Sequence, residues 1–343
     1  MVKRSDTYRL IHTLYILLLF LFLGGVSLFA QEKDRPREGE GVYAFLRRNN
    51  RAGADYQKEF LELNKGKFGK NQSLLRGVEY ALPPLREGAA TQPATPSASN
   101  IKQREPLFGK ALEEYEITSN ELKGATFYVV SGHGGPDPGA LGKKGKQELH
   151  EDEYAYDIAL RLARHLMTRG AKVHIIIQDA KDGIRDGEIL KNSKTETCMG
   201  DPIPLRQVER LKQRCVKINE LYKKEKPAYA RAIFIHIDSR SIHKQLDVFF
   251  YHSHTETSKQ LARTMRQTFS DKYREHQPQR GFSGTVEQRN LYVLKEATPV
   301  ALYVELGNIQ NSADQQRIVS ANNREALAKW LCAGFVVDYG KSR

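Results

Sequence analysis

Residues 126–135 read Thr-Phe-Tyr-Val-Val-Ser-Gly-His-Gly-Gly, a short apolar run that passes directly into a glycine-rich turn. The apolar part is typical of a buried strand. The glycines carry no Cβ and therefore allow a tight turn directly after that strand. We expect His133 to lie at the edge of a sheet, with open space in front of its imidazole.

Similar apolar runs recur along the chain and alternate with amphipathic stretches. Extended runs lie at 126–130, 172–177, 231–237, 246–251, 291–294 and 300–304, and helical patterns lie at 152–169, 206–225, 256–274 and 322–338. This order predicts an α/β fold in which a mostly parallel six-stranded sheet is flanked by helices. In such folds, loops at the carboxyl ends of the strands hold the functional residues.

Two further polar residues stand at the ends of predicted elements. Glu151 opens the first long helix, and apolar residues follow it at i+4, i+7 and i+11, so Glu151 is expected to face the sheet. His236 is the penultimate residue of the run Ala-Ile-Phe-Ile-His-Ile at 232–237. Both side chains are thus expected near the turn that carries His133.

Taken singly, each of these residues has an ordinary explanation. A histidine at a strand end is commonly a core or surface residue, and a glutamate at a helix start commonly complements the helix dipole. Together, His133, Glu151 and His236 offer two imidazoles and a carboxylate, which is a ligand set of hydrolytic zinc sites. We interpret them as candidate Zn²⁺ ligands, an interpretation that the resemblance described below strengthens.

Glu305 directly follows the apolar run at 300–304. A carboxylate at the end of a buried strand must be paired or functional, because an unpaired buried charge costs several kcal/mol. One interpretation is a salt bridge with one of the many arginines. The other is a general base and acid beside a zinc site.

Several ordered motifs resemble those of one enzyme family. The segment 130–140, Val-Ser-Gly-His-Gly-Gly-Pro-Asp-Pro-Gly-Ala, matches the pattern Asp-Pro-Gly-His-Gly-Gly-x-Asp-x-Gly-Ala after its first two positions. Further matches follow in the family's order at Leu211, Arg214 and Asn219, at 234–238, at Arg280-Gly281, at 291–294 and at 304–311. Over roughly residues 125–340, the chain resembles the zinc-dependent N-acetylmuramoyl-L-alanine amidases of bacterial cell-wall hydrolysis.

This resemblance implies a function and a role for each candidate residue. It implies Zn²⁺ held by His133, Glu151 and His236, with Glu305 as the catalytic residue. The implied reaction is cleavage of the amide bond between N-acetylmuramic acid and the L-alanine of the peptidoglycan stem peptide. The chain departs from the family pattern at Val130-Ser131, Asp238 and Asn308, but none of these departures removes a predicted ligand.

Two alternatives stay open from the sequence. The protein could be a zinc peptidase that acts within the stem peptide, or a non-catalytic peptidoglycan-binding or regulatory protein. An activator protein is a further candidate partner. The stretch 182–204 is longer than a simple connection needs, which fits either a substrate-contacting or gating loop or a passive surface insertion.

The amino terminus has the pattern of a secretory signal peptide at residues 1–30. Basic residues precede an apolar run from about Leu14 to Phe29, and small residues favour cleavage after Ala30. An uncleaved anchor is the rival interpretation, which Gly24 and Gly25 weigh against. We predict an exported protein, periplasmic or otherwise in the cell envelope, with no membrane span after signal removal.

A smaller unit is predicted at residues 39–85, where short extended ends flank two helical stretches. The segments 39–43, 60–64 and 74–83 resemble a LysM module, which implies binding to N-acetylglucosamine-containing glycan; an amphipathic spacer is the alternative. We assign residues 86–121 to a linker, because their first part is rich in Ala, Thr, Pro, Ser and Gln. The zinc amidase-like catalytic domain then occupies 122–343.

Composition limits the partners further. The formal net charge is +13, which favours anionic polymers such as cell-wall carboxylates or phospholipid head groups. We predict no nucleic-acid partner, because no basic helix carries aromatic residues at base-reading spacing. The cysteines, Cys198, Cys215 and Cys332, permit at most one disulfide, and the latter two are interpreted as small core residues.

Overall fold

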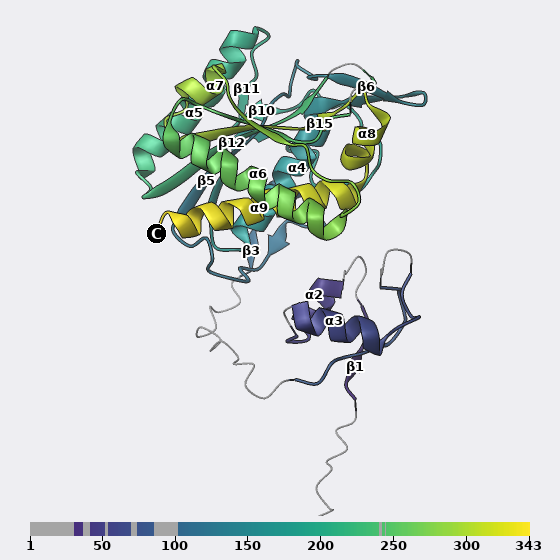
Figure 1. Cartoon of the computed structure of the whole chain (residues 1–343). Helices are drawn as coiled ribbons and strands as arrows, with labels where there is room; N and C mark the ends of the chain where they lie inside the picture. The colour runs from purple at the N-terminus through teal and green to yellow at the C-terminus, as the bar shows by residue number, and fades with distance from the viewer. Residues whose placement is uncertain are drawn as a thin grey trace, which may run out of the picture. The chain divides into compact units, whose positions relative to one another are not determined.

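The computed structural model of the chain describes residues 31–36, 42–51, 54–69, 74–85, 102–239, 242–243 and 245–343. The predicted signal segment, residues 1–30, lies outside these ranges. The chain divides into two compact units, Met1–Ser97 and Ala98–Arg343 (Figure 1). The larger unit contains all four candidate site residues.

The smaller unit places two helices between two short strands. Helices α2 (Val42–Arg48) and α3 (Ala54–Leu63) lie between β1 (Lys33–Asp34) and β2 (Tyr80–Ala81), which pair antiparallel. The first strand thus lies before residue 39, where the sequence placed the start of this unit. Its core consists of buried aromatic and leucine side chains: Phe45, Leu46, Phe60, Tyr80 and Leu82.

A six-stranded sheet forms the centre of the larger unit, in the order β14-β13-β15-β12-β5-β8. Its strands are β5 (Ala125–Ser131), β8 (Lys172–Ile175), β12 (Tyr229–Asp238), β13 (Phe249–His252), β14 (Thr285–Gln288) and β15 (Val300–Asn308). Neighbouring strands run parallel except for β13 and β15, which run antiparallel. The predicted mostly parallel six-stranded sheet is therefore confirmed.

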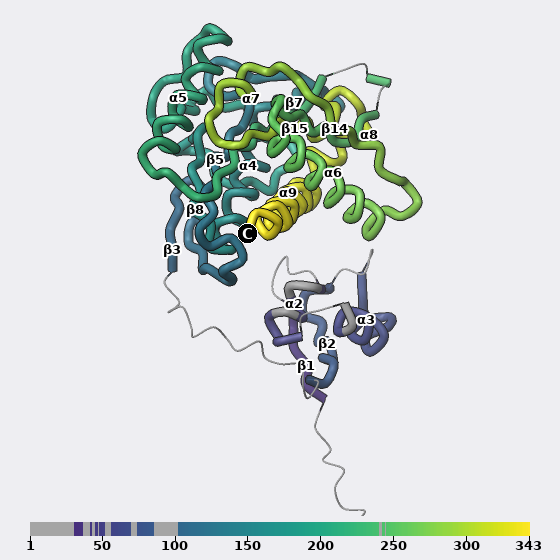
Figure 2. Tube along the Cα trace, turned by 60° about the vertical axis from the view of Figure 1, so that its left-hand side comes forward, coloured from purple at the N-terminus to yellow at the C-terminus, as the bar shows by residue number. Residues whose placement is uncertain are grey.

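Helices cover both faces of this sheet. One face packs against α4 (Glu151–Met167), α6 (Glu256–His276) and α9 (Ala321–Lys341), and α9 lies against both α4 and α6 (Figure 2). The other face packs against α5 (Gln207–Glu225) and α7 (Tyr292–Glu296). None of the helices formed by the described residues combines the length and hydrophobicity needed to cross a membrane.

The division into two faces follows from strand geometry, because successive side chains of a β-strand point to opposite faces of the sheet. Along β5, Phe127 and Val129 point into the core beneath α4, whereas Tyr128 and Val130 point into the core beneath α5. Cys215 and Cys332 are buried in α5 and α9, and both are free thiols, as is Cys198. They are the small core residues that the sequence indicated.

One predicted strand is wrong. Residues 291–294 begin the short helix α7, and the sixth strand is β14, which the sequence analysis missed. A four-residue apolar run does not distinguish a strand from a helical turn, and Val293 and Leu294 are adjacent residues that both pack toward α5. β14 escapes detection because it lies at the sheet edge, where its side chains are half-buried or exposed.

The predicted linker also needs correction. Residues 86–101 lie outside the described residues, but 102–121 belong to the larger unit. There β3 (Gln103–Arg104) pairs with β4 (Glu114–Tyr115) around the 3₁₀ helix η2 (Pro106–Phe108). Phe108 is buried against Tyr156 and Leu160 of α4, so this segment packs onto the domain rather than linking to it.

A hairpin, a helix and a small second sheet were also not predicted. A hairpin of β6 (Leu141–Lys144) and β7 (Gln147–His150) leads directly into α4, and helix α8 (Ser312–Val319) follows β15. Strands β9 (Ile177–Gln178), β10 (Thr197–Cys198) and β11 (Asp201–Pro202) form a small separate sheet. The hairpin and α8 both border the edge of the main sheet where the candidate residues lie, because β7 ends one residue before Glu151 and β15 contains Glu305.

Candidate metal centre and active site

Two parallel strands and one helix meet at the His/Glu cluster, which we define as His133, Glu151 and His236. Ser131, at the end of β5, pairs with Ile235 of β12, so the turn carrying His133 and the side chain of His236 lie at the same sheet edge. Glu151 is the first residue of α4 and is only 4% exposed. The structure thus brings these three predicted residues together.

Three donor atoms of the His/Glu cluster face one another. Glu151 Oε1 lies 3.2 Å from His133 Nε2 and 3.0 Å from His236 Nδ1, and the two nitrogens are 3.1 Å apart. Tetrahedral zinc, with bonds of about 2.0–2.1 Å to nitrogen and oxygen, separates its ligands by about 3.3–3.4 Å. The residue types and their separations therefore fit a zinc ion.

Asp137 orients the His133 ring. Its Oδ2 lies 2.9 Å from His133 Nδ1 and accepts a hydrogen bond at 2.7 Å from Arg210 Nη2. In the neutral tautomer that carries its hydrogen on Nδ1, the Nδ1–H group donates a hydrogen bond to this carboxylate. The Nε2 lone pair then faces Glu151 and His236. Asp137 and Arg210 therefore fix the tautomer that a metal ligand needs.

Gly132 leaves the space that the His236 ring occupies. A Cβ at this glycine would lie 1.9 Å from His236 Cε1 and 2.0 Å from Nε2, so no other residue type fits beside the ring as it stands. The ring also stacks on Tyr303, with ring centroids 4.2 Å apart. The His236 imidazole is thus packed closely against both a glycine and an aromatic ring.

Glu151 is fixed by backbone donors as well as by the histidines. Its Oε1 accepts a hydrogen bond from the amide of Ile237 at 2.9 Å, and its Oε2 accepts one from Ala140 at 2.7 Å. Burial opposes ionisation, but the charge and hydrogen bonding of the His133 and His236 imidazoles hold the pKa of Glu151 well below its usual value. Glu151 is therefore an anion at neutral pH.

The two histidines differ in their protonation. Burial would lower the pKa of His133, but the carboxylates of Glu151 and Asp137 outweigh this effect and raise it to about 10. Burial dominates at His236 and lowers its pKa to about 4, despite the attraction of Glu151. Without a metal, the cluster therefore holds a proton at the position where a cation would be bound.

Glu305 lies on β15 in register with His236 on the neighbouring strand. Its Oε2 is buried and, among the described residues, has no hydrogen-bond partner. Burial raises the pKa of Glu305 well above its usual value, and the negative charges of Glu151 and Asp238 add to this effect. Among the described residues, no ion pair holds Glu305, so the surroundings offer no partner for the salt-bridge interpretation.

A protein-family model matches most of the larger unit. The family is described as N-acetylmuramoyl-L-alanine amidase, and the match covers residues 128–336, more than half of the chain. The chain belongs to this amidase family. The family resemblance inferred from the motifs is therefore confirmed.

Solved structures of amidases resemble this chain at low sequence identity. AmiC2 of Nostoc punctiforme shares 18% identity over 65% of this chain and 99% of its own, with a TM-score of 0.44. An amidase from Clostridium difficile 630 shares 21% identity over 66% of this chain and 100% of its own, with a TM-score of 0.45. The CwlD amidase from Clostridioides difficile, in complex with the GerS lipoprotein, shares 17% identity over 63% and 98%, with a TM-score of 0.45. A comparison with curated proteins gives no match.

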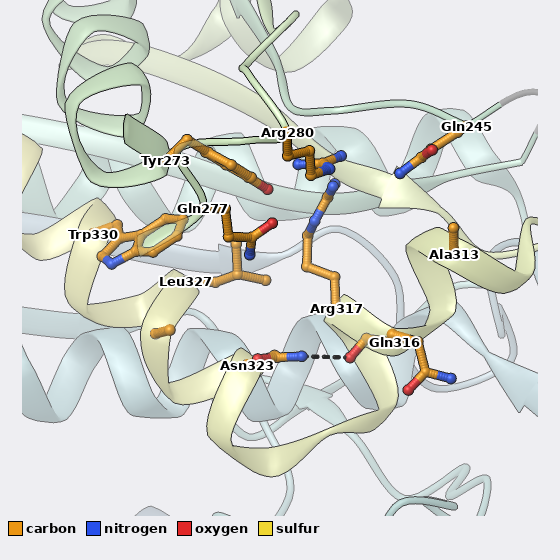
Figure 3. A pocket seen from close by; sticks show the side chains of 11 residues that line it. Gln245, Tyr273, Gln277, Arg280, Ala313, Gln316, Arg317, Asn323, Leu327 and Trp330 are labelled. Carbon is orange, nitrogen blue, oxygen red and sulfur yellow. Dashed lines mark hydrogen bonds between the residues drawn. The ribbon is translucent and has the colours of Figure 1, made fainter. Parts of the chain in front are cut away.

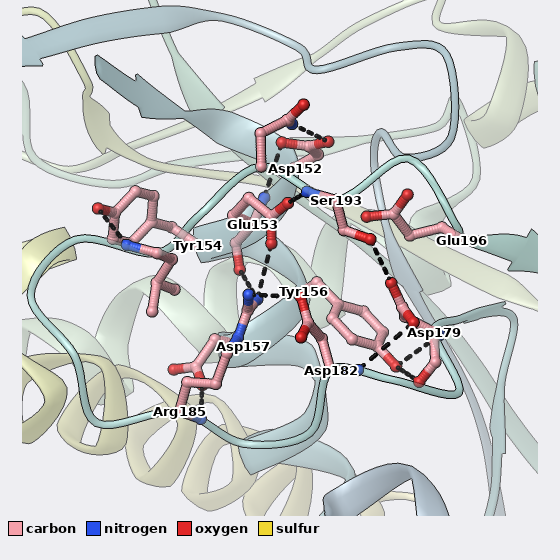
Figure 4. Close-up of polar contacts among 12 residues, drawn as sticks. Asp152, Glu153, Tyr154, Tyr156, Asp157, Asp179, Asp182, Arg185, Ser193 and Glu196 are labelled. Atoms are coloured by element: carbon pink, nitrogen blue, oxygen red, sulfur yellow. Dashed lines mark hydrogen bonds and ion pairs between the residues drawn. The ribbon is translucent and has the colours of Figure 1, made fainter. Parts of the chain in front are cut away.

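In this amidase-family chain, the long stretch 182–204 is attached to the first turn of α4 by the acidic anchor, which we define as Asp152, Glu153 and Glu196 (Figure 4). Glu153 accepts hydrogen bonds from Arg185 Nη2 at 2.8 Å and from the amide of Ser193. Figure 4 shows the Glu153 carboxylate between Arg185 and Ser193. This part of the loop is therefore packed against the domain.

The acidic anchor also reaches the turn that carries His133. Glu196 Oε2 accepts a hydrogen bond from the amide of Gly135 at 2.9 Å. Asp152 Oδ2 accepts a hydrogen bond from Asn192 Nδ2 at 3.3 Å. Burial, together with the charges of Glu153 and Glu196, raises the pKa of Asp152 to about 8, so this carboxyl is mainly protonated at neutral pH.

Sequence reasoning missed the roles of three residues beside the His/Glu cluster. Asp137 is part of the quoted glycine-rich motif, and its spacing of four from His133 is a signal that could have identified it. Arg210 lies 73 residues away from Asp137 in sequence, so no local pattern connects them. Arg214 was noted only as a family match, although it is buried in the cavity beside His236.

Proposed function

We propose that this chain is a zinc-dependent peptidoglycan hydrolase that cleaves the amide bond between N-acetylmuramic acid and L-alanine. The observation that carries this proposal is the convergence of three donor atoms within 3.0–3.2 Å of one another. In the proposed enzyme, His133, Glu151 and His236 hold Zn²⁺, and Glu305 is the catalytic residue.

The surroundings of the His/Glu cluster support metal binding. The donor set combines an anionic carboxylate with two imidazole nitrogens, which suits Zn²⁺. A Cβ at Gly139 would lie 2.7 Å from Glu151 Oε2 and 2.8 Å from His133 Cδ2, so glycine leaves room on this side as Gly132 does at His236. When bound, zinc would act as a Lewis acid toward a water molecule and the scissile carbonyl.

We propose Glu305 as the general base and acid, a role supported by its buried carboxyl group in register with His236. Glu305 is proposed to take one proton from the attacking water, while the water oxygen bonds to the carbonyl carbon of the amide. The same carboxyl then returns the proton to the L-alanine nitrogen as the carbon–nitrogen bond breaks. The water's other proton stays on the new carboxyl group, so the products are a glycan strand with a free lactyl carboxylic acid, which ionises in water, and a stem peptide with a free amino-terminal L-alanine.

Digestion of purified peptidoglycan tests this proposal. The protein is incubated with peptidoglycan, with and without a chelator, and the soluble products are identified by mass spectrometry. We expect chelator-sensitive release of stem peptides with free amino-terminal L-alanine. A new amine on another residue would instead establish a peptidase, and peptidoglycan binding without a new amine would establish a non-catalytic protein or one that lacks its activator.

We further propose that the smaller unit binds N-acetylglucosamine-containing glycan in the manner of a LysM module. Its strand–helix–helix–strand order and its matching segments support this proposal. Retention of the full chain on insoluble peptidoglycan, in competition with N-acetylglucosamine oligomers, tests it. We expect the oligomers to release the protein, and retention that they do not alter would leave the unit as a spacer.

We also propose export through residues 1–30, with cleavage after Ala30, because peptidoglycan lies outside the cytoplasm. Amino-terminal sequencing of the protein from the cell envelope would detect Gln31 as the first residue. Intact Met1 in an envelope fraction would indicate an uncleaved anchor instead. An activator partner is proposed only if the purified protein proves inactive and a cell-envelope extract restores its activity.

A further inference from the structure

A cavity of about 170 Å³ adjoins the His/Glu cluster. His133 and His236 line it together with residues of helices α5 and α7. Arg210, Leu211 and Arg214 of α5 line the cavity, with Tyr292 and Val293 of α7 among the remaining lining residues. A small group attached to a substrate at the cluster can therefore reach side chains of α5.

Arg214 is the unusual residue of this cavity. It is 2% exposed, and its Nε and Nη2 are buried without a hydrogen-bond partner among the described residues. Burial lowers the pKa of Arg214 to about 10, which still leaves the guanidinium charged at neutral pH. A buried charge whose donors are unsatisfied is costly, and a hydrophobic residue of similar size would avoid this cost.

Two other arginines show how this chain normally satisfies such a group. Arg324, which is 0% exposed, donates to Asp157 Oδ2 at 2.6 Å and also to four backbone carbonyls. Arg210 lines the same cavity as Arg214, but it donates to Asp137 and to the carbonyl of Leu205. Burial alone therefore does not explain the unsatisfied donors of Arg214.

A second cavity, of about 150 Å³, provides a further contrast (Figure 3). It is lined by Arg280 and Arg317, whose Nη2 atoms lie 2.5 Å and 3.2 Å from Asp247 Oδ1. Their charges are thus offset by the protein itself. Arg214 has no such carboxylate among the described residues, and its cavity adjoins the His/Glu cluster.

We propose that Arg214 binds a carboxylate in the peptide half of the substrate, namely the α-carboxylate of the residue that follows L-alanine. A guanidinium presents paired N–H groups that match a carboxylate, and both Nε and Nη2 are free to donate. This is the first carboxylate beyond the scissile amide in a stem peptide linked through the γ-carboxyl of glutamate. The inference rests on the proposed amidase function and adds a requirement for a free carboxylate at that position.

Two pairs of probes that differ in one group test the proposal. The substrates are N-acetylmuramoyl-L-alanyl-D-glutamic acid and N-acetylmuramoyl-L-alanyl-D-isoglutamine, in which the α-carboxylate is an amide. The corresponding dipeptides without the sugar serve as probes for calorimetric binding. We expect the zinc-loaded wild-type protein to show a KM and a dissociation constant about 10- to 100-fold lower for the acid than for the amide.

Arg214→Met and Arg214→Lys then assign this preference to the side chain. Arg214→Met is expected to raise KM for the acid about 10- to 100-fold and to abolish the preference for it over the amide, with kcat changed far less. Arg214→Lys is expected to keep part of the preference, because it retains the charge but not the paired donors. Arg206→Met, at the residue directly before α5 with a side chain that is 83% exposed, is the matched control and should retain the full preference.

Two outcomes would overturn the proposal. Equal KM values for acid and amide in the wild-type protein would show that Arg214 does not bind this carboxylate, even if the Arg214 variants fail to fold. A fall in kcat with an unchanged preference would place Arg214 at the reacting carbonyl oxygen instead. A third outcome separates the two proposals. If neither substrate is hydrolysed but the dipeptide acid still binds more tightly than its amide, the amidase reaction is refuted and carboxylate binding by Arg214 is supported.

Discussion

The first turn of α4 contributes to two carboxylate clusters that behave in opposite ways. Glu151 points to the imidazoles of His133 and His236, whereas Glu153, two residues later, points to Arg185 and the amide of Ser193. In the acidic anchor, Arg185 offsets the charge of Glu153. In the His/Glu cluster, the carboxylate faces imidazole nitrogens that can bind a cation in place of the proton held there.

Protonation separates the two clusters further. In the acidic anchor, burial and the neighbouring carboxylates raise the pKa of Asp152 to about 8, so the cluster reduces its charge by keeping a proton. In the His/Glu cluster, the pKa of Glu151 is lowered and the carboxylate stays ionised. In the His/Glu cluster and in the acidic anchor alike, possible metal-binding atoms of the three side chains lie within 4.8 Å of one another. Proximity alone therefore does not identify a metal site.

Removing the proton acceptor beside the His/Glu cluster should have the largest effect. Glu305→Gln keeps the shape of the side chain but cannot take a proton from water, so kcat is expected to fall about 100- to 10,000-fold. Zinc content should stay at the wild-type value, because Glu305 is not a predicted ligand. Steady-state kinetics and metal analysis of the same sample check both statements, and normal turnover would refute the role of Glu305.

Breaking the acidic anchor should affect stability instead of metal binding. Glu153→Ala removes the carboxylate that Arg185 contacts in the first turn of α4. Because this partly buried arginine then loses that paired charge, we expect the free energy of unfolding to fall by about 3 kcal/mol. Urea denaturation measures this change. Glu188→Gln, at an exposed glutamate paired with Lys144, is the control and should leave stability almost unchanged. Loss of zinc in Glu153→Ala, with the fold intact, would contradict the division between the clusters.

A smaller effect is expected from the carboxylate that orients His133. Asp137→Asn retains an oxygen for His133 Nδ1 but loses the charge held by Arg210, so zinc affinity should fall about 10- to 100-fold. Competition with a chromogenic chelator measures this affinity without relying on turnover. Asp201→Asn, at an exposed aspartate paired with Lys217, should leave it unchanged. An unaltered zinc affinity in Asp137→Asn would mean that the glycine turn alone orients the histidine.

The sequence indicated the central sheet because its buried strands are apolar runs that end at His133, His236 and Glu305. It failed at β14, whose exposed edge position leaves no apolar pattern, and at α7, where a four-residue run suits a helical turn equally well. The candidate ligands could be predicted because each stands at the end of an element.

The residues around these candidate ligands were harder to predict. Arg210 acts on Asp137 across the fold, and the unsatisfied donors of Arg214 appear only once the surroundings of its guanidinium are known. Both residues lie on α5, where the sequence shows only an amphipathic helix with many charged residues. Their importance depends on contacts between distant segments, which no local pattern encodes.

The metal content of two matched variants tests the central claim most directly. Glu151→Gln and Glu153→Gln change the same group at positions two residues apart on α4, and zinc per chain can be measured by inductively coupled plasma mass spectrometry after dialysis. We predict one zinc per chain in the wild-type protein and in Glu153→Gln, and a large loss of zinc in Glu151→Gln. Full zinc content in Glu151→Gln, or zinc lost only from Glu153→Gln, would contradict the assignment of the metal to the His/Glu cluster.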